Sequence, residues 1–254
     1  MRLCSRSRPT WAQLTRLSLA LSIVVLALTI AAPRVAAWQT APPSLPLPPP
    51  PPADAPEGFT SAETERARIH VEPGTEVDAD TFARSWGLLI DDGLGQLESF
   101  LPPLEDKIDV YVYVSDGSYA TATAAARWRE PEVTDVLANP GRGDIAVNAI
   151  ALARRTPLEA ENALRHAMSH VAAREASGGR IPRGFDEGLA AYFERPVAAR
   201  LARHAALVQN ARAGGDLMSW SDLNRPAAPD IPPPVLIAHA YSMVAFLMDR
   251  HGPR

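Results

Sequence analysis

The sequence predicts an α+β domain in which a small mixed sheet packs with several helices. Residues 107–114 alternate between apolar and polar side chains, as a strand with one buried face does. Residues 157–177 repeat apolar side chains at helical spacing and begin with a helix-capping sequence. At 254 residues, of which 46% are hydrophobic, the chain is long enough for one sizeable domain.

The composition excludes several kinds of protein. Charged residues make up 21% of the chain and the formal net charge is -4, which argues against a nucleic-acid partner. The one cysteine, Cys4, lies in a basic N-terminal segment, so an intrachain disulfide and a cysteine-based metal cluster are both impossible. Any metal site must therefore use histidine and carboxylate ligands.

Residues 1–37 have the order of a secretory signal. Arginines precede an uncharged apolar run over residues 17–32, and small residues follow it. The run is long for a signal core and short for a membrane span, so the segment is either a signal peptide cleaved after Ala37 or a signal anchor in the membrane. The domain is expected to be secreted or membrane-anchored, outside the cytoplasm. Cleavage would remove five arginines and leave 20 basic against 29 acidic residues, a net charge of −9.

Residues 38–58 form a Pro-rich linker with five consecutive prolines at positions 48–52. Such a segment adopts polyproline II conformation and cannot build a core. It is interpreted as a stalk or, alternatively, as a ligand for a domain that recognises proline.

The domain itself, residues 59–254, begins with a strand and a long helix. The strand is predicted at residues 68–71. Asp78 or Asp80 caps the helix, which should end before Pro102. The alternating strand described above comes next, and an irregular, Ala-rich stretch follows it.

A further strand at residues 144–150 leads almost directly into the next helix. Its place before that helix suggests that it lines a cleft, where Asn148 and Ala149 would contact an extended peptide by β-augmentation. Alternatively, it is a plain core or edge strand without a binding role.

The helix from about Pro157 carries two histidines at metal-binding spacing. Thr156 and Glu159 form a capping box around its first turn. His166 and His170 lie on one face, one turn apart, so both rings can reach a single metal ion. The spacing is that of the HExxH zinc site.

Zinc bound by two histidines needs at least one more protein ligand, and a short second helix is predicted downstream over residues 183–194. The His pair, the sixteen residues between His170 and Glu187, and the DEGLAAYFE segment from Asp186 to Glu194 together resemble the gluzincin superfamily of zinc metallopeptidases. The closest pattern is that of small bacterial peptidase-MA-like domains, in which HExxH is followed by (N/D)EGxAxYxE. The resemblance implies a zincin-like fold, Zn²⁺ as cofactor, a peptide or protein substrate, and His166, His170 and Glu187 as the metal ligands.

Two positions depart from the family pattern. Ala167 stands where the motif has the Glu that takes a proton from metal-bound water, and a methyl group cannot do so. Ala191 stands where the family has a carboxylate that braces a ligand histidine, and loss of such a brace weakens metal affinity about 10–100-fold. Both departures predict a degenerate site with impaired or no activity.

The rest of the chain is predicted to be helical, over residues 197–213 and again from residue 232. In gluzincins a Tyr or His from a later element can hydrogen-bond the tetrahedral intermediate, which makes Tyr241 and His239 candidates. Alternatively, Tyr241 packs in the apolar stripe of its helix. A domain of this type is expected to continue past residue 254, so the C-terminus is interpreted as truncated.

Three functions remain open on the sequence. The first is an exported or membrane-anchored metallopeptidase-like protein that hydrolyses peptide bonds with metal-activated water, impaired because the general base is missing. The second is a non-catalytic envelope protein that binds an extended peptide in the cleft. The third is a purely structural domain without a metal.

Overall fold

The computed structural model describes residues 55–74, 78–124, 135–139, 143–224 and 233–252. The predicted signal or anchor segment and most of the Pro-rich linker lie outside these residues. None of the described helices is both long enough and apolar enough to span a bilayer. The described residues form an α+β fold, with one five-stranded mixed sheet and eight helices among them.

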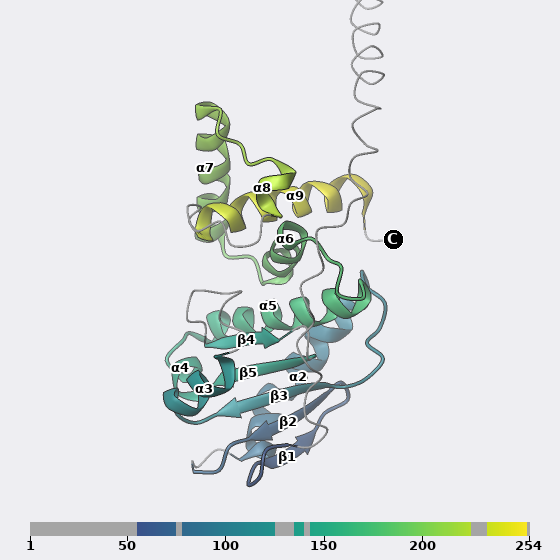
Figure 1. Cartoon of the computed structure of the whole chain (residues 1–254), viewed down its shortest axis with the longest axis vertical. Coiled ribbons are helices and arrows are strands. Elements are labelled where there is room, and N and C mark those ends of the chain that lie inside the picture. Colours follow the sequence, from purple (N-terminus) through teal and green to yellow (C-terminus); the bar gives the residue numbers. More distant parts are fainter. Residues whose placement is uncertain (1–54, 75–77, 125–134, 140–142, 225–232, 253–254) are drawn as a thin grey trace, which may run out of the picture. The chain divides into compact units, whose positions relative to one another are not determined.

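The sheet has the strand order β1-β2-β3-β5-β4 (Figure 1). The three central strands β2, β3 and β5 run parallel to one another, and the two outer strands are antiparallel to their neighbours. The strands are β1 (Thr60–Glu63), β2 (Ala67–Val71), β3 (Ile108–Tyr113), β4 (Val136–Asn139) and β5 (Asp144–Asn148). The small mixed sheet predicted from the sequence is therefore confirmed.

One face of the sheet forms the main core together with two helices, α2 (Ala79–Leu97) and α5 (Pro157–Ala176). Alternate residues of the central strands point into it, because side chains along a strand alternate between faces. Each fully buried aliphatic side chain of this kind contributes about 1.5–3 kcal/mol. The strand residues involved are Ala67, Ile69, Val71, Ile108, Val110, Val112, Ile145 and Val147.

Helices α2 and α5 are fixed against each other by close packing and by an ion pair from a buried arginine. A Cβ on Gly93 would lie 2.6 Å from Met168 Cε, so a larger residue on α2 would require the Met168 side chain of α5 to move. The Arg165 side chain, 2% exposed, donates from Nε to Glu161 at 2.7 Å and from Nη2 to Asp92 of α2 at 3.2 Å. This anchoring precedes His166 by one residue and so holds the histidine-bearing face of α5 in place.

The first turn of α5 confirms the predicted capping box. Thr156 Oγ1 accepts a hydrogen bond from the Glu159 N–H, and the Glu159 carboxylate accepts one from the Thr156 N–H at 3.0 Å. These bonds satisfy N–H groups that have no partner within the helix. The helix begins at Pro157, as predicted, and ends at Ala176.

A second, helical region packs beyond α5. Helix α6 (Arg183–Phe193) lies between α5 and α9 (Pro233–His251), and α7 (Ala198–Gly214) also packs on α9 (Figure 1). A Cβ on Gly188 would lie 2.3 Å from the Ala240 carbonyl oxygen, so α6 and α9 are in backbone contact there. The short helix α8 (Trp220–Leu223) touches both. The predicted helices over residues 183–194, 197–213 and from 232 are confirmed, with small shifts in their ends.

The opposite face of the sheet carries a row of polar side chains across three strands. His70 of β2 lies with Nδ1 2.8 Å from Ser61 Oγ of β1 and Nε2 2.9 Å from the carboxylate of Asp109 in β3. Arg68 donates to both oxygens of Asp109, at 2.8 and 2.9 Å, and Tyr111 stacks on the His70 ring. Both His70 nitrogens therefore have protein partners.

Some elements differ from the sequence prediction. Strand β1 and strand β4 were not predicted, and helix α3 (Asp116–Thr123) lies in the stretch expected to be irregular. The strand predicted over residues 144–150 ends at Asn148, because Asn148 caps the following short helix, α4 (Ala149–Ala153).

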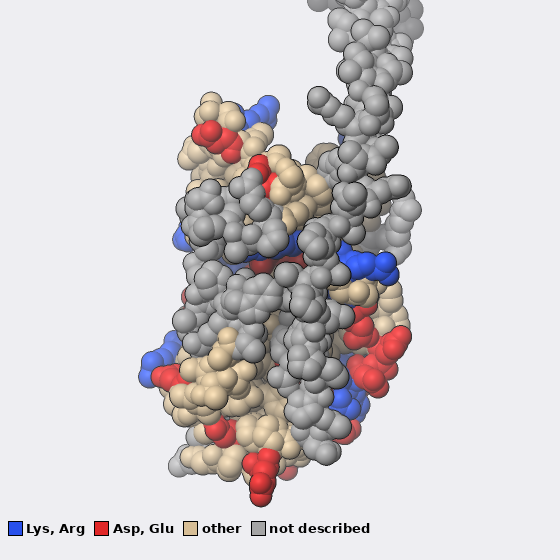
Figure 2. Space-filling view, viewed as in Figure 1, with Lys and Arg blue, Asp and Glu red and all other residues tan. Residues whose placement is uncertain are grey.

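The described part of the face drawn in Figure 2 shows acidic and basic side chains next to each other, without a continuous basic area.

Candidate metal centre

Helix α5 presents both histidines on the side that faces α6. Their ring centroids are 4.8 Å apart and their planes are at 76°. The His170 side chain is 4% exposed and that of His166 is 26% exposed, so the pair reaches from the interior toward solvent. The predicted i, i+4 arrangement is confirmed.

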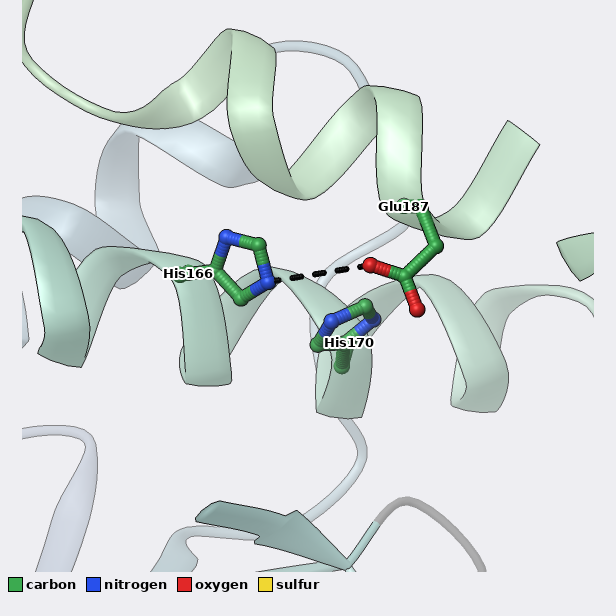
Figure 3. A group of neighbouring side chains, drawn as sticks. All are labelled: His166, His170 and Glu187. Carbon is green, nitrogen blue, oxygen red and sulfur yellow. Dashed lines mark ion pairs between the residues drawn. The ribbon is translucent and has the colours of Figure 1, made fainter. Parts of the chain in front are cut away.

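Helix α6 brings the carboxylate of Glu187 to this pair (Figure 3). His166 Nε2 lies 4.0 Å from Glu187 Oε2, and one ligand atom from each of the three residues lies within 4.8 Å of the others. Tetrahedral zinc, with bonds of about 2.0–2.2 Å to N and O, holds its ligand atoms about 3.4 Å apart. The three donors are of the right chemical type, and a small side-chain movement would bring them to that separation.

Each histidine also has a carboxylate on its other nitrogen. His166 Nδ1–H donates to Glu194 Oε1 at 3.0 Å, and His170 Nδ1–H donates to Asp186 Oδ1 at 2.9 Å. In metal sites, a carboxylate in this position fixes the ring orientation and the tautomer, which leaves Nε2 as the coordinating atom. The two rings are thus oriented as metal ligands.

This finding corrects the inference drawn from Ala191. The sequence predicted that a histidine brace is lost because residue 191 has no carboxylate. The structure places a carboxylate on each histidine from other positions: Asp186 of α6 precedes Glu187 by one residue, and Glu194, the residue after α6, follows it by seven. Ala191 itself is buried.

Asp186 and Glu194 are in turn held by arginines. Arg174, one turn after His170 on α5, lies with Nε 3.5 Å from Asp186 Oδ2. Arg200 of α7 donates from Nη1 to Glu194 Oε2. Each line of contacts therefore runs from a histidine through a carboxylate to a guanidinium group.

Residue 167, which follows the first histidine, has an apolar side chain and lies in an apolar environment. Ala167 is 2% exposed and belongs to the core between α5 and the sheet. The neighbouring Ser169 is fully buried. Asp186 and Glu194 are committed to the histidines, so neither stands in for the missing Glu in this arrangement.

Tyr241 of α9 packs against aromatic rings of two other helices, and a catalytic role for it stays a prediction. Its ring lies against Tyr192 of α6, at a centroid distance of 6.2 Å, and against His204 of α7, at 5.4 Å. Burial, with a smaller effect from Tyr192, raises the pKa of Tyr241. His239 donates from Nδ1 to the Val235 carbonyl of its own helix. These contacts are those of packed residues between helices.

The strand expected to bind a peptide by β-augmentation has no free edge in the structure, and the peptide-binding role of Asn148 and Ala149 stays a prediction. Strand β5 is paired on both sides, with β3 and with β4, so its backbone is not open to a peptide. The Asn148 side chain donates to Asp116 at 2.8 Å and accepts from the Ala151 N–H, and Ala149 begins α4. Among the described strands, the one at the edge next to α5 is β4, which pairs only with β5.

Sequence reasoning did not identify Asp186 and Glu194 as the hydrogen-bond partners of the two histidines, although the sequence contains a signal for Glu194. In the helix predicted over residues 183–194, Glu187 and Glu194 lie two turns apart on one face, although in the structure Glu194 is the residue just after α6. No family model matches the chain, and comparison with curated proteins also finds no match.

Proposed function

We propose that this chain is a gluzincin-type zinc metallopeptidase homologue with a zincin-like fold, in which His166, His170 and Glu187 hold Zn²⁺. The observation that carries the proposal is the convergence of these three side chains from two adjoining helices. The carboxylates on both histidine Nδ1 atoms support it, because a histidine with one nitrogen fixed in this way is oriented to coordinate through the other.

A zinc ion bound here would polarise a peptide carbonyl and lower the pKa of a coordinated water. The chain's own residues supply the ligands and their orientation but no proton acceptor at position 167. Positioned proton transfer contributes typically about 10²–10⁴-fold to rate. We therefore infer that peptide hydrolysis is impaired or absent, and that the protein is a pseudoenzyme or a slow hydrolase.

A non-catalytic peptide-binding protein is the second candidate, and one observation favours it. Strand β4 lies at the edge of the sheet and packs against α5, the helix that carries both histidines. An edge strand can add an extended peptide through backbone hydrogen bonds, which requires no general base. Export or membrane attachment through residues 1–37 fits either function and stays part of the proposal.

Metal analysis of the purified chain tests the proposal. We expect about one zinc per chain after loading and dialysis, and none in Glu187→Ala, because a site with two protein ligands binds weakly. A Glu187→Ala chain that retains the wild-type zinc content would contradict the assignment.

Hydrolysis assays separate a pseudoenzyme from an active peptidase. We expect a casein-type substrate to be stable with the natural chain and to be cleaved by Ala167→Glu, with Ala167→Gln as the control of equal size. Circular dichroism checks that both variants fold, because residue 167 is buried. Hydrolysis by the natural chain that a chelator abolishes would overturn the role assigned to Ala167.

A further inference from the structure

Behind the two bracing carboxylates lie two arginines of different origin. Arg174 belongs to α5, the helix that already carries both histidines. Arg200 comes from α7, which supplies none of the three ligand residues. The line His166–Glu194–Arg200 therefore connects the candidate metal centre with a third helix.

Glu194 depends on a partner more than Asp186 does. Asp186 lies inside α6, so the helix fixes its backbone. Glu194 is the residue after the last turn of α6, with an extended backbone at φ −62° and ψ 148°. Its side chain is nevertheless largely buried, at 11% exposed, with one oxygen on His166 Nδ1 and the other on the Arg200 guanidinium. Glu194 thus joins the His166 imidazole to the Arg200 guanidinium through its two oxygens.

The Arg200 contact does more than hold the chain between α6 and α7. The backbone there is already fixed from α5, because Arg195 N–H donates to Asn162 Oδ1 at 2.6 Å and Asn162 Nδ2 donates to the Arg195 carbonyl at 3.2 Å. Arg200 Nη2 adds a further bond to the same carbonyl at 3.3 Å. Of Asn162, Arg195 and Arg200, it is Arg200 that also bonds the Glu194 carboxylate.

We propose that Arg200 is a positioning residue of the metal centre, which holds Glu194 so that His166 presents Nε2 toward Glu187. The inference rests on the function proposed above. A planar guanidinium can bond a carboxylate and a carbonyl at once, whereas a lysine ammonium keeps the charge without the fixed fork. Arg200 acts on the metal through two side chains and touches neither substrate nor ion.

Zinc titration of the full chain against a chromophoric chelator tests this role. We expect Arg200→Ala to weaken zinc affinity by up to about 10-fold, the lower end of the range found when the partner bonded directly to a ligand histidine is removed. Arg200→Lys should recover part of the loss. Arg203→Ala is the matched control, because Arg203 is an exposed arginine on the same helix and its removal changes the charge equally. It should bind zinc as the natural chain does.

The visible spectrum of the Co²⁺-loaded chain supplies a second readout that a structural role would not change. We expect the ligand-field bands to shift in Arg200→Ala and to return toward the natural position in Arg200→Lys. If Arg200→Ala and the natural chain have the same zinc affinity and the same spectrum, the proposal is wrong. Loss of zinc in His166→Ala in the same experiment would still support the metal site itself.

Two further outcomes are decisive. If the natural chain binds no zinc, both the positioning role and the proposed function are wrong. If Arg200→Ala does not fold, Arg200→Lys decides: an affinity between those of the natural chain and His166→Ala supports the role, and an unchanged affinity with an unchanged spectrum contradicts it.

Discussion

Two histidine arrangements in this molecule differ in what the ring nitrogens contact. On the sheet, His70 uses one nitrogen for Ser61 and the other for Asp109, so its ring is a bridge between strands. Between α5 and α6, His166 and His170 each give Nδ1 to a carboxylate and converge with Glu187. All three rings are close to acidic residues, yet only the helical pair has the geometry of a ligand set.

The comparison shows why residue type and burial alone do not identify a site. A histidine held at both nitrogens satisfies its own hydrogen-bonding groups and has nothing to offer a metal. A histidine whose Nδ1 is held by a carboxylate is oriented for coordination through Nε2. The difference implies that a change beside His70 leaves zinc affinity at the helical pair unaffected.

The first prediction compares Asp186 and Asp109, two carboxylates that each hydrogen-bond a histidine, and it concerns the largest change in zinc affinity. Asp186→Asn should weaken zinc affinity about 10–100-fold, because a neutral amide oxygen accepts a weaker hydrogen bond from His170 Nδ1–H than a carboxylate does. Asp109→Asn makes the same change beside His70 and should leave zinc affinity unchanged while lowering the free energy of unfolding by about 1–3 kcal/mol. Zinc titration and urea unfolding of the metal-free variants measure both.

Either of two results would break this comparison. Equal weakening of zinc binding by the two variants would show that the sheet and the helical region are coupled. Unchanged zinc affinity in Asp186→Asn would show that the hydrogen bond to His170 does not support coordination.

A smaller effect is expected from pH on the sheet region. Burial acts to raise the pKa of Asp109, but hydrogen bonds from Arg68 and His70 outweigh it, so the pKa lies below its ordinary value. Since the folded pKa is below that of the unfolded chain, about 3.9, this contribution to stability is complete above that pH and is lost as the pH falls through the folded pKa. The unfolding free energy of the metal-free natural chain should therefore fall more steeply below about pH 4 than that of Asp109→Asn. Parallel curves in urea unfolding across this range would contradict the assignment.

Local signals in the sequence predicted the elements that carry the candidate site. The capping box at Thr156 and Glu159 located the start of α5, and the alternation of residues 107–114 located β3, because both patterns depend on neighbours in the chain. Strand β1, with the sequence TSAE, has no apolar alternation and exists through its pairing with β2. Helix α3 has little amphipathic character and depends on its cap at Ser115.

The sequence predicts the three candidate ligands but not the residues around them. The pair His166 and His170 follows from i, i+4 spacing, which is local, and Glu187 follows from the resemblance of its segment to the gluzincin pattern. The roles of Asp186, Glu194 and Arg200 depend on how α5, α6 and α7 pack, which no spacing reveals. For the same reason the sequence could not show that β5 is an interior strand and closed to a peptide.

X-ray absorption at the zinc edge of the loaded chain tests whether the helical pair and Glu187 hold the metal. We expect a ligand shell with two imidazole nitrogens and at least one carboxylate oxygen at about 2.0–2.2 Å. One imidazole should be lost in His166→Ala, and the spectrum of His70→Ala should be unchanged. A shell without two imidazoles, or a spectrum that His166→Ala leaves unchanged, would contradict this ligand set.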